Sequence, residues 1–164
     1  HILPYLGEQE LYGEFHLDEP WSSEHNRKLI RRMPVVYKAP GSLAEPGKTN
    51  YLGIVGDQAV LAAPKQEFYG KVPPRGIAFR DMTDGTSNTI GAVEVNDALA
   101  VIWTKPDDLK PDNDDPIRGL VGLRPGVFLA LVCDGSVHSI ARTIDKRTLK
   151  ALFTRNGGER VDNF

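Results

Sequence analysis

The strongest constraint on the fold is a run of seven apolar residues, VFLALVC at positions 127–133, that leads directly into Asp134 and Gly135. An unbroken apolar run of this length predicts a central strand that is covered on both faces. Asp-Gly is a favoured pair for a two-residue type I′ turn, so a β-hairpin that pairs Val132 with Val137 should follow. The fold therefore has to contain a β-sheet.

Helix signals lie at the two ends of the chain. Residues 6–17 carry apolar side chains at helical spacing, although Gly13 weakens the pattern. A serine at 22 or 23 can cap a second helix, which Pro34 should end. Asp145 can cap a C-terminal helix that ends at the glycines 157–158. The buried stripe of that helix is expected to hold Leu149, Leu152 and Phe153.

Short β-prone runs occupy the middle of the chain, separated by proline and glycine clusters. The expected strands lie within residues 35–40, 49–56, 59–63 and 88–95. Residues 64–76 should form a long surface excursion, and the acidic, proline-rich insert 105–116 should be a loop. Because strands and helices do not alternate regularly, we expect one globular α+β domain over residues 1–164 with a mainly antiparallel sheet.

Composition excludes several classes of protein. The net charge is only −2, which gives no general attraction for nucleic acid. The sequence contains no run of about 18 apolar residues, which is the length that a helix needs to span a bilayer. The chain begins at His1 without an initiator methionine, which suggests a processed product or a fragment whose upstream anchor is missing. The single Cys133 cannot form an internal disulfide, and within its apolar run it should be a buried, inert thiol.

Catalytic motifs are absent. GTSNT resembles a nucleophile elbow, but Thr89 stands where that motif needs its second glycine. His138 follows the predicted turn, where a solvated or core-edge imidazole is more common than a general base. We therefore expect no enzyme activity and no cofactor.

Calcium is the one metal to consider. Asp81 and Asp84, with nearby hydroxyl and amide oxygens, supply the hard ligands that calcium prefers, and so does the acidic insert from Asp107 to Asp115, but neither loop has the EF-hand spacing. Turn chemistry is the alternative explanation, because Asp and Asn side chains hydrogen-bond to their own backbone and Gly85 readily takes a positive φ. The turn interpretation is favoured.

Glu94 is an unusual residue because it lies inside a strand that looks well buried. Alternation places it on the same face as Ile90 and Ala92. A buried carboxylate needs an arginine, a lysine or backbone donors as partner. It could belong to a structural ion pair or contact a ligand, with Trp103 and Lys105 as neighbouring aromatic and cationic groups; core packing is the alternative role for Trp103.

Six segments of the chain together resemble a large family of pilin-like envelope proteins typical of planctomycetes, known only as a domain of unknown function. They are HILPYLGEQELYGEFHLDEPWSSEHN, TNYLGIVG, DMTDGTSNTIGAVEV, WTKPDDL, CDGSVHSI and LKALFTRNGGE. Members of this family resemble type II secretion pseudopilins, in which a long hydrophobic helix precedes the globular part. The resemblance implies an extracytoplasmic location, assembly through protein contacts, and membrane contact only through an upstream helix.

A signature of this family is a histidine, nine further residues, and then Asp-Gly. The Asp-Gly is present at 134–135, but Arg124 takes the position of the histidine. An arginine there could still hydrogen-bond or pair with a carboxylate.

Two functions follow as hypotheses. The first is a noncatalytic pseudopilin-like domain that serves cell-surface assembly or secretion. The second is a soluble ligand-binding module with a cleft near Glu94, in which Trp103, Lys105 and Arg124 are the other candidate binding residues; a hydrolase is a third alternative. An exposed apolar patch would favour the first hypothesis, and a deep apolar pocket containing Glu94 would favour the second.

Overall fold

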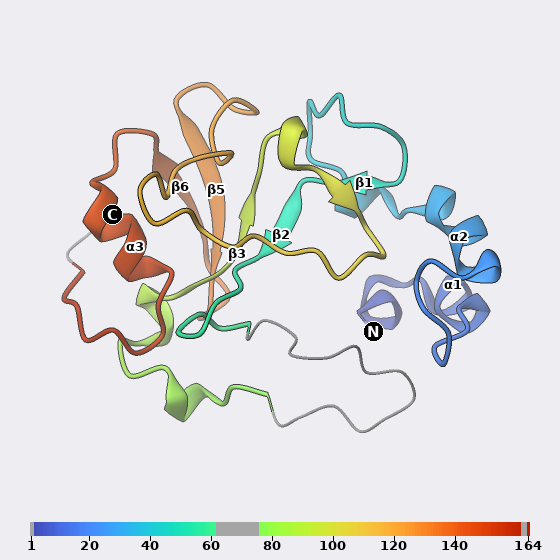
Figure 1. The fold of residues 1–164 in the computed structure, drawn as a ribbon, viewed down its shortest axis with the longest axis horizontal. Coiled ribbons are helices and arrows are strands. Elements are labelled where there is room, and N and C mark those ends of the chain that lie inside the picture. Colours follow the sequence, from blue (N-terminus) through green and yellow to red (C-terminus); the bar gives the residue numbers. More distant parts are fainter. Residues whose placement is uncertain (1, 62–75, 162–163) are drawn as a thin grey trace.

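The computed structural model describes residues 2–61, 76–161 and 164. Short helices at both ends of the chain flank antiparallel strands, which confirms the expected α+β architecture (Figure 1). The predicted excursion over residues 64–76 lies outside the described residues, except for Gly76. Within the described ranges, no helix has the length and apolar character needed to cross a membrane.

The N-terminal helices are short. A 3-10 turn at Leu3–Leu6 precedes α1 (Gln9–Glu14), and α2 (Glu24–Leu29) continues as a 3-10 turn over Ile30–Arg32. The hydroxyl of Ser23 accepts the Asn26 N–H at 3.1 Å, which confirms the predicted cap. Helix α1 covers only half of the predicted residues 6–17. Glycine lowers helix propensity and a short helix is barely stable by itself, so the apolar spacing alone did not determine where this helix begins and ends.

The main sheet has four antiparallel strands in the order β2-β3-β5-β6 (Figure 1). The strands are β2 (Tyr51–Gly53), β3 (Ile90–Glu94), β5 (Val127–Val132) and β6 (Val137–Ala141). A separate two-stranded sheet pairs β1 (Lys48–Thr49) with β4 (Val101–Ile102). The strand predictions for residues 49–56 and 88–95 are thus confirmed.

One predicted strand is wrong. Val35–Tyr37 forms a 3-10 turn after Pro34, although its residues favour strands, so the tertiary context overrides a local preference here. Of the predicted strand 59–63, residues 62–63 lie outside the described residues, and the described part forms only an isolated bridge between Leu61 and Val55.

The β5–β6 hairpin differs from its predicted register by one residue. Leu131, not Val132, pairs with Val137. The N–H of Val132 donates instead to the carbonyl oxygen of Ser136 at 2.9 Å, so the loop contains three residues. Because a shift of one residue exchanges the two faces of a strand, Val137 lies next to Leu131 on the same face of the sheet.

The turn itself is not type I′. That turn needs a positive φ at both central residues, and among the described residues only glycines have one. Gly135 alone takes it, with a φ of 91°, as is common in three-residue hairpin loops. The carboxylate of Asp134 accepts the backbone N–H and the hydroxyl of Ser136 at 2.9 and 2.6 Å, which stabilises this longer loop.

Strand β5 is central in the sheet but is covered on one face only, which corrects the prediction. Phe128, Ala130 and Val132 point into the core, each with 1% of its surface exposed. On the opposite face Leu131 is 44% exposed. The unbroken apolar run therefore does not mean burial on both sides; one of its faces lies open to solvent.

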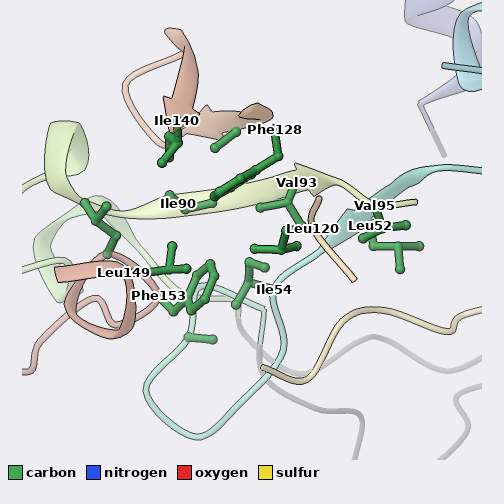
Figure 2. Packing of buried hydrophobic residues seen from close by; sticks show 13 residues of the cluster. Leu52, Ile54, Ile90, Val93, Val95, Leu120, Phe128, Ile140, Leu149 and Phe153 are labelled. Carbon is green, nitrogen blue, oxygen red and sulfur yellow. The ribbon is translucent and has the colours of Figure 1, made fainter. Parts of the chain in front are cut away.

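The main core lies between the inner face of the sheet and α3 (Lys146–Leu152), as Figure 2 shows. Asp145 caps α3, and Leu149 and Leu152 of the predicted stripe are fully buried. The helix ends at Leu152, earlier than the predicted glycines, and Phe153 still packs into the core. The labelled core residues in Figure 2 are Leu52, Ile54, Ile90, Val93, Val95, Leu120, Phe128, Ile140, Leu149 and Phe153.

Candidate functional site

A β-bulge in β3 decides the direction of the Glu94 side chain. Ile90 is opposite Val132, whereas Ala92 is opposite Leu131, so Gly91 is an extra residue in this strand. Ile90 consequently points into the core, and Ala92 and Glu94 lie on the outer face of the sheet. The predicted shared face is correct for Ala92 and wrong for Ile90, because alternation does not continue through a bulge.

Glu94 and Arg124 form a bidentate ion pair. Arg124 Nε donates to one carboxylate oxygen at 2.6 Å, and its second guanidinium nitrogen donates to the other at 3.0 Å. The side chain of Glu94 is 1% exposed and that of Arg124 is 31% exposed. The hydrogen bond with Glu94 raises the pKa of Arg124. The expectation that a buried carboxylate needs a cationic or backbone partner is confirmed, and the partner is the arginine at the signature position.

The surroundings of this pair are apolar. A depression of about 330 Å³ on the outer face of the sheet is lined by Glu94 and six neighbours. Tyr51 lies directly opposite Glu94 in the β2–β3 ladder. Burial raises the pKa of the Tyr51 hydroxyl, and the nearby Glu94 charge raises it further. The neighbours are Tyr51, Ala92, Val93, Leu129, Leu131 and Val137.

Trp103 and Lys105 lie in other surroundings. The Trp103 indole N–H donates to the Ile30 carbonyl oxygen at 2.9 Å, and its ring packs among the N-terminal helices. Lys105 pairs with Asp107 on the surface at 2.6 Å. Of the four candidate ligand-binding residues, the structure therefore brings together only Glu94 and Arg124.

Asp81 and Asp84 hold backbone groups of different segments. Asp81 accepts the Ala78 N–H at 2.9 Å within its own turn. The two carboxylate oxygens of Asp84 accept the N–H groups of Gly157 and Gly158 at 2.7 and 3.0 Å. Within the described ranges, no three His, Cys, Asp or Glu side chains form a group that could hold a metal ion. Calcium binding at Asp81 and Asp84 stays a prediction without geometric support.

Turn chemistry does account for the rest of this loop. Gly85 has a φ of 94°, and the Thr89 hydroxyl donates to its carbonyl oxygen at 2.9 Å. The Asn88 amide donates to the Asp84 carbonyl oxygen at 3.0 Å. The loop also contributes to long-range structure, because the Asp84 carboxylate accepts hydrogen bonds from the two glycines that follow α3.

Arg155 is a connecting residue that the sequence did not indicate. Its guanidinium donates to the carbonyl oxygens of Asp57 and Ala59 at 2.9 and 2.6 Å, and its own carbonyl oxygen accepts the Asp84 N–H. It thereby joins three segments that are far apart in the sequence. No local pattern could have revealed this, because an arginine after a helix is usually solvated.

Cys133 is partly buried after β5. Burial raises the pKa of its thiol, and the neighbouring Asp134 charge acts in the same direction. A raised pKa favours the protonated thiol, but the residue is only partly buried, so the predicted full burial is wrong and its inertness stays a prediction.

Comparison with known protein families matches residues 1–117 to the family described as "Protein of unknown function (DUF1559)". The chain belongs to this family. The match confirms the resemblance to an uncharacterised family, whereas its pilin-like and planctomycete character remain predictions. Arg124 and the Asp-Gly pair lie beyond the matched residues. No curated protein and no solved structure matches the chain.

Proposed function

We propose that this chain is the noncatalytic, extracytoplasmic globular domain of a pseudopilin-like protein, and that it serves cell-surface assembly or secretion through protein contacts. The observation that carries the proposal is the apolar outer face of the main sheet. This face is defined by Tyr51, Ala92, Leu129, Leu131 and Val137.

The outer face is open and extends beyond the sheet. Leu131 is 44% exposed and Val137 is 63% exposed. Tyr51 also borders a second depression, which Val35 and Val36 line with 84% and 57% of their surfaces exposed. Contiguous exposed apolar surface of this kind is typical of protein interaction sites.

The state of Glu94 favours a protein contact over a ligand cleft on this face. Arg124 already occupies both carboxylate oxygens, and the Glu94 side chain is only 1% exposed. An apolar surface with one neutralised ion pair suits the centre of a protein interface, where unpaired charges are rare. The ligand-binding alternative near Glu94 would need this ion pair to open.

A site-specific photo-crosslinker tests the proposal. We expect benzoylphenylalanine in place of Leu131, in cells that make the protein, to give discrete adducts with envelope proteins or with further copies of this chain, identified by mass spectrometry. Phe79 is the matched control position, because it is 74% exposed but lies outside the outer face. Equal yields of crosslinked adducts at positions 131 and 79, or no adduct at position 131, would refute the proposal that this face binds other proteins.

Location is tested separately. We expect the chain in the envelope fraction of the producing cells, accessible to added protease under conditions in which a cytoplasmic marker stays protected. Recovery with the cytoplasmic marker would contradict the extracytoplasmic assignment, whatever the crosslinking shows.

A further inference from the structure

A pocket of about 380 Å³ lies where the N-terminal helices meet the segment that follows β4. It shares no lining residue with the outer apolar face. Aromatic side chains from distant parts of the chain dominate its wall. They are Tyr12, Phe15, Trp21, Tyr37 and Trp103.

The aromatic wall is held in place by contacts among its members. The ring centroids of Trp103 and Phe15 are 5.8 Å apart in an edge-on arrangement, and those of Trp103 and Tyr37 are 5.3 Å apart. The Trp103 indole N–H is fixed by the Ile30 carbonyl oxygen. A pocket whose walls are already ordered loses little conformational entropy when a ligand binds.

The loop that carries Trp21 is also ordered. Asn26 is buried, accepts the His16 N–H at 3.0 Å, and donates to the carbonyl oxygens of His16 and Pro20 at 2.9 and 3.0 Å. The His16 ring stacks on that of His25 with centroids 3.6 Å apart. These bonds fix the course of the chain between α1 and α2, and with it this side of the pocket.

Glu19 is the acidic side chain of the pocket, and no lysine or arginine lines it. Its carboxylate contacts the ring of His16, another lining residue, with His16 Nδ1 and Glu19 Oε1 2.9 Å apart. A hydrogen bond from Ser23 and then one from His16 lower the pKa of Glu19, which keeps the carboxylate ionised at neutral pH. A carboxylate together with the faces of aromatic rings is a combination that attracts cations.

We propose that this pocket binds a small organic ammonium ion, with the aromatic side chains around the cation and Glu19 as its counter-ion. The volume is within the range of small-molecule sites. The site goes beyond the assembly role proposed above, since it uses other residues and needs no protein partner.

Tryptophan fluorescence gives a direct assay, because the chain has only two tryptophans and both Trp21 and Trp103 line the pocket. We expect choline to change this fluorescence saturably, and calorimetry to give the same Kd. The control ligand is 3,3-dimethylbutan-1-ol, which has the shape of choline without its charge. It should bind about ten times more weakly, because the cation–π and ionic terms are lost.

Variants of Glu19 test the counter-ion. We expect Glu19→Gln to weaken choline binding about fivefold or more and Glu19→Asp to retain most of it, because only the first change removes the charge. Glu45→Gln is the matched control, since Glu45 pairs with Lys48 and lies outside the pocket. Circular dichroism of each variant establishes that it is folded.

Three results would overturn the proposal: no saturable response to choline in the folded protein, equal affinity for choline and its neutral analogue, or equal loss of binding in the Glu19→Gln and Glu45→Gln variants. Tighter binding of a neutral disaccharide than of choline would also do so, and would reassign the aromatic wall to sugar stacking.

Discussion

At the scale of single residues, the Glu94–Arg124 pair shows how the outer face accommodates a charge. Glu94 lies among apolar side chains, and its partner comes from a position 30 residues further along the chain. The desolvation of two charges offsets much of their attraction, so such a pair adds little net stability. Losing one partner is much more costly, because the other charge is then left buried and unpaired.

We therefore expect Arg124→Ala to lower the free energy of unfolding by about 2–3 kcal/mol, below the value for a fully buried pair because Arg124 keeps 31% exposure. The double variant Glu94→Met with Arg124→Met should recover most of this loss. Urea denaturation measures both. Arg118→Ala is the control, since the 3.6 Å contact of Arg118 with Asp112 is largely exposed and should contribute under about 0.5 kcal/mol.

If Arg124→Ala and Arg118→Ala lower the free energy of unfolding by the same small amount, the Glu94–Arg124 ion pair does not stabilise the end of the strand. That result would favour a ligand-binding role for Glu94.

At the scale of elements, α3 shows how one side chain can define the start of a helix. The Asp145 carboxylate accepts the N–H groups of Arg147 and Thr148 at 2.9 and 3.1 Å. These otherwise unpaired donors would face water or the core without it. The hydrogen bond from the Thr148 N–H, followed by that from Arg147, lowers the pKa of Asp145 below its ordinary value of 3.8.

A pH dependence follows from this cap. Because the folded-state pKa is lowered, the ionised carboxylate stabilises the fold above about pH 4, and this contribution is lost as the pH falls through the folded-state pKa. We expect Asp145→Ala to have a lower Tm than the wild type at pH 7, with a difference that narrows steadily toward pH 3. Thermal melts at a series of pH values measure it.

Asp145→Asn separates capping from charge. Asparagine caps helices well but does not titrate. At pH 7 the Tm of Asp145→Asn should therefore lie closer to the wild-type Tm than the Tm of Asp145→Ala does. A constant difference between the wild type and Asp145→Ala from pH 7 to pH 3 would show that the charge of the cap is irrelevant to stability.

At the scale of the whole molecule, most of the buried apolar residues that the structure describes fall into two clusters. The larger one joins the main sheet to α3, and the smaller one holds the N-terminal helices together with Trp103. Figure 1 shows these helices and α3 at opposite ends of the molecule. Among the described residues of the smaller cluster, three are buried, namely Leu3, Leu11 and Leu29. The N-terminal part should therefore open more easily than the rest.

We expect Leu11→Ala to accelerate amide hydrogen exchange in residues 3–32 while leaving that of β5 and β6 almost unchanged. Leu149→Ala, the matched change in the larger cluster, should lower the free energy of unfolding by about 2–5 kcal/mol and accelerate exchange throughout. Hydrogen exchange with mass spectrometry compares the two variants. Equal acceleration of amide exchange in the sheet in both variants would mean that the two clusters unfold as one unit.

The sequence by itself determined the features that depend on neighbouring residues. Ser23 and Asp145 cap their helices as predicted, since a cap bonds to backbone groups only two or three residues away. The strand at 90–94 and the hairpin around Asp134 and Gly135 were likewise evident from local patterns. The need of Glu94 for a partner was also predictable, because it follows from burial and charge alone.

Only the tertiary structure decided which groups meet. The bulge at Gly91 placed Glu94 on the outer face of the sheet, and the three-residue hairpin loop placed Val137 beside Leu131 on the same open face. The contacts of Glu94 with Arg124 and of Asp84 with Gly157 join positions 30 and 73 residues apart. Such pairings depend on strand register and on the packing of the whole chain, and a pattern confined to a few neighbouring residues carries no information about them.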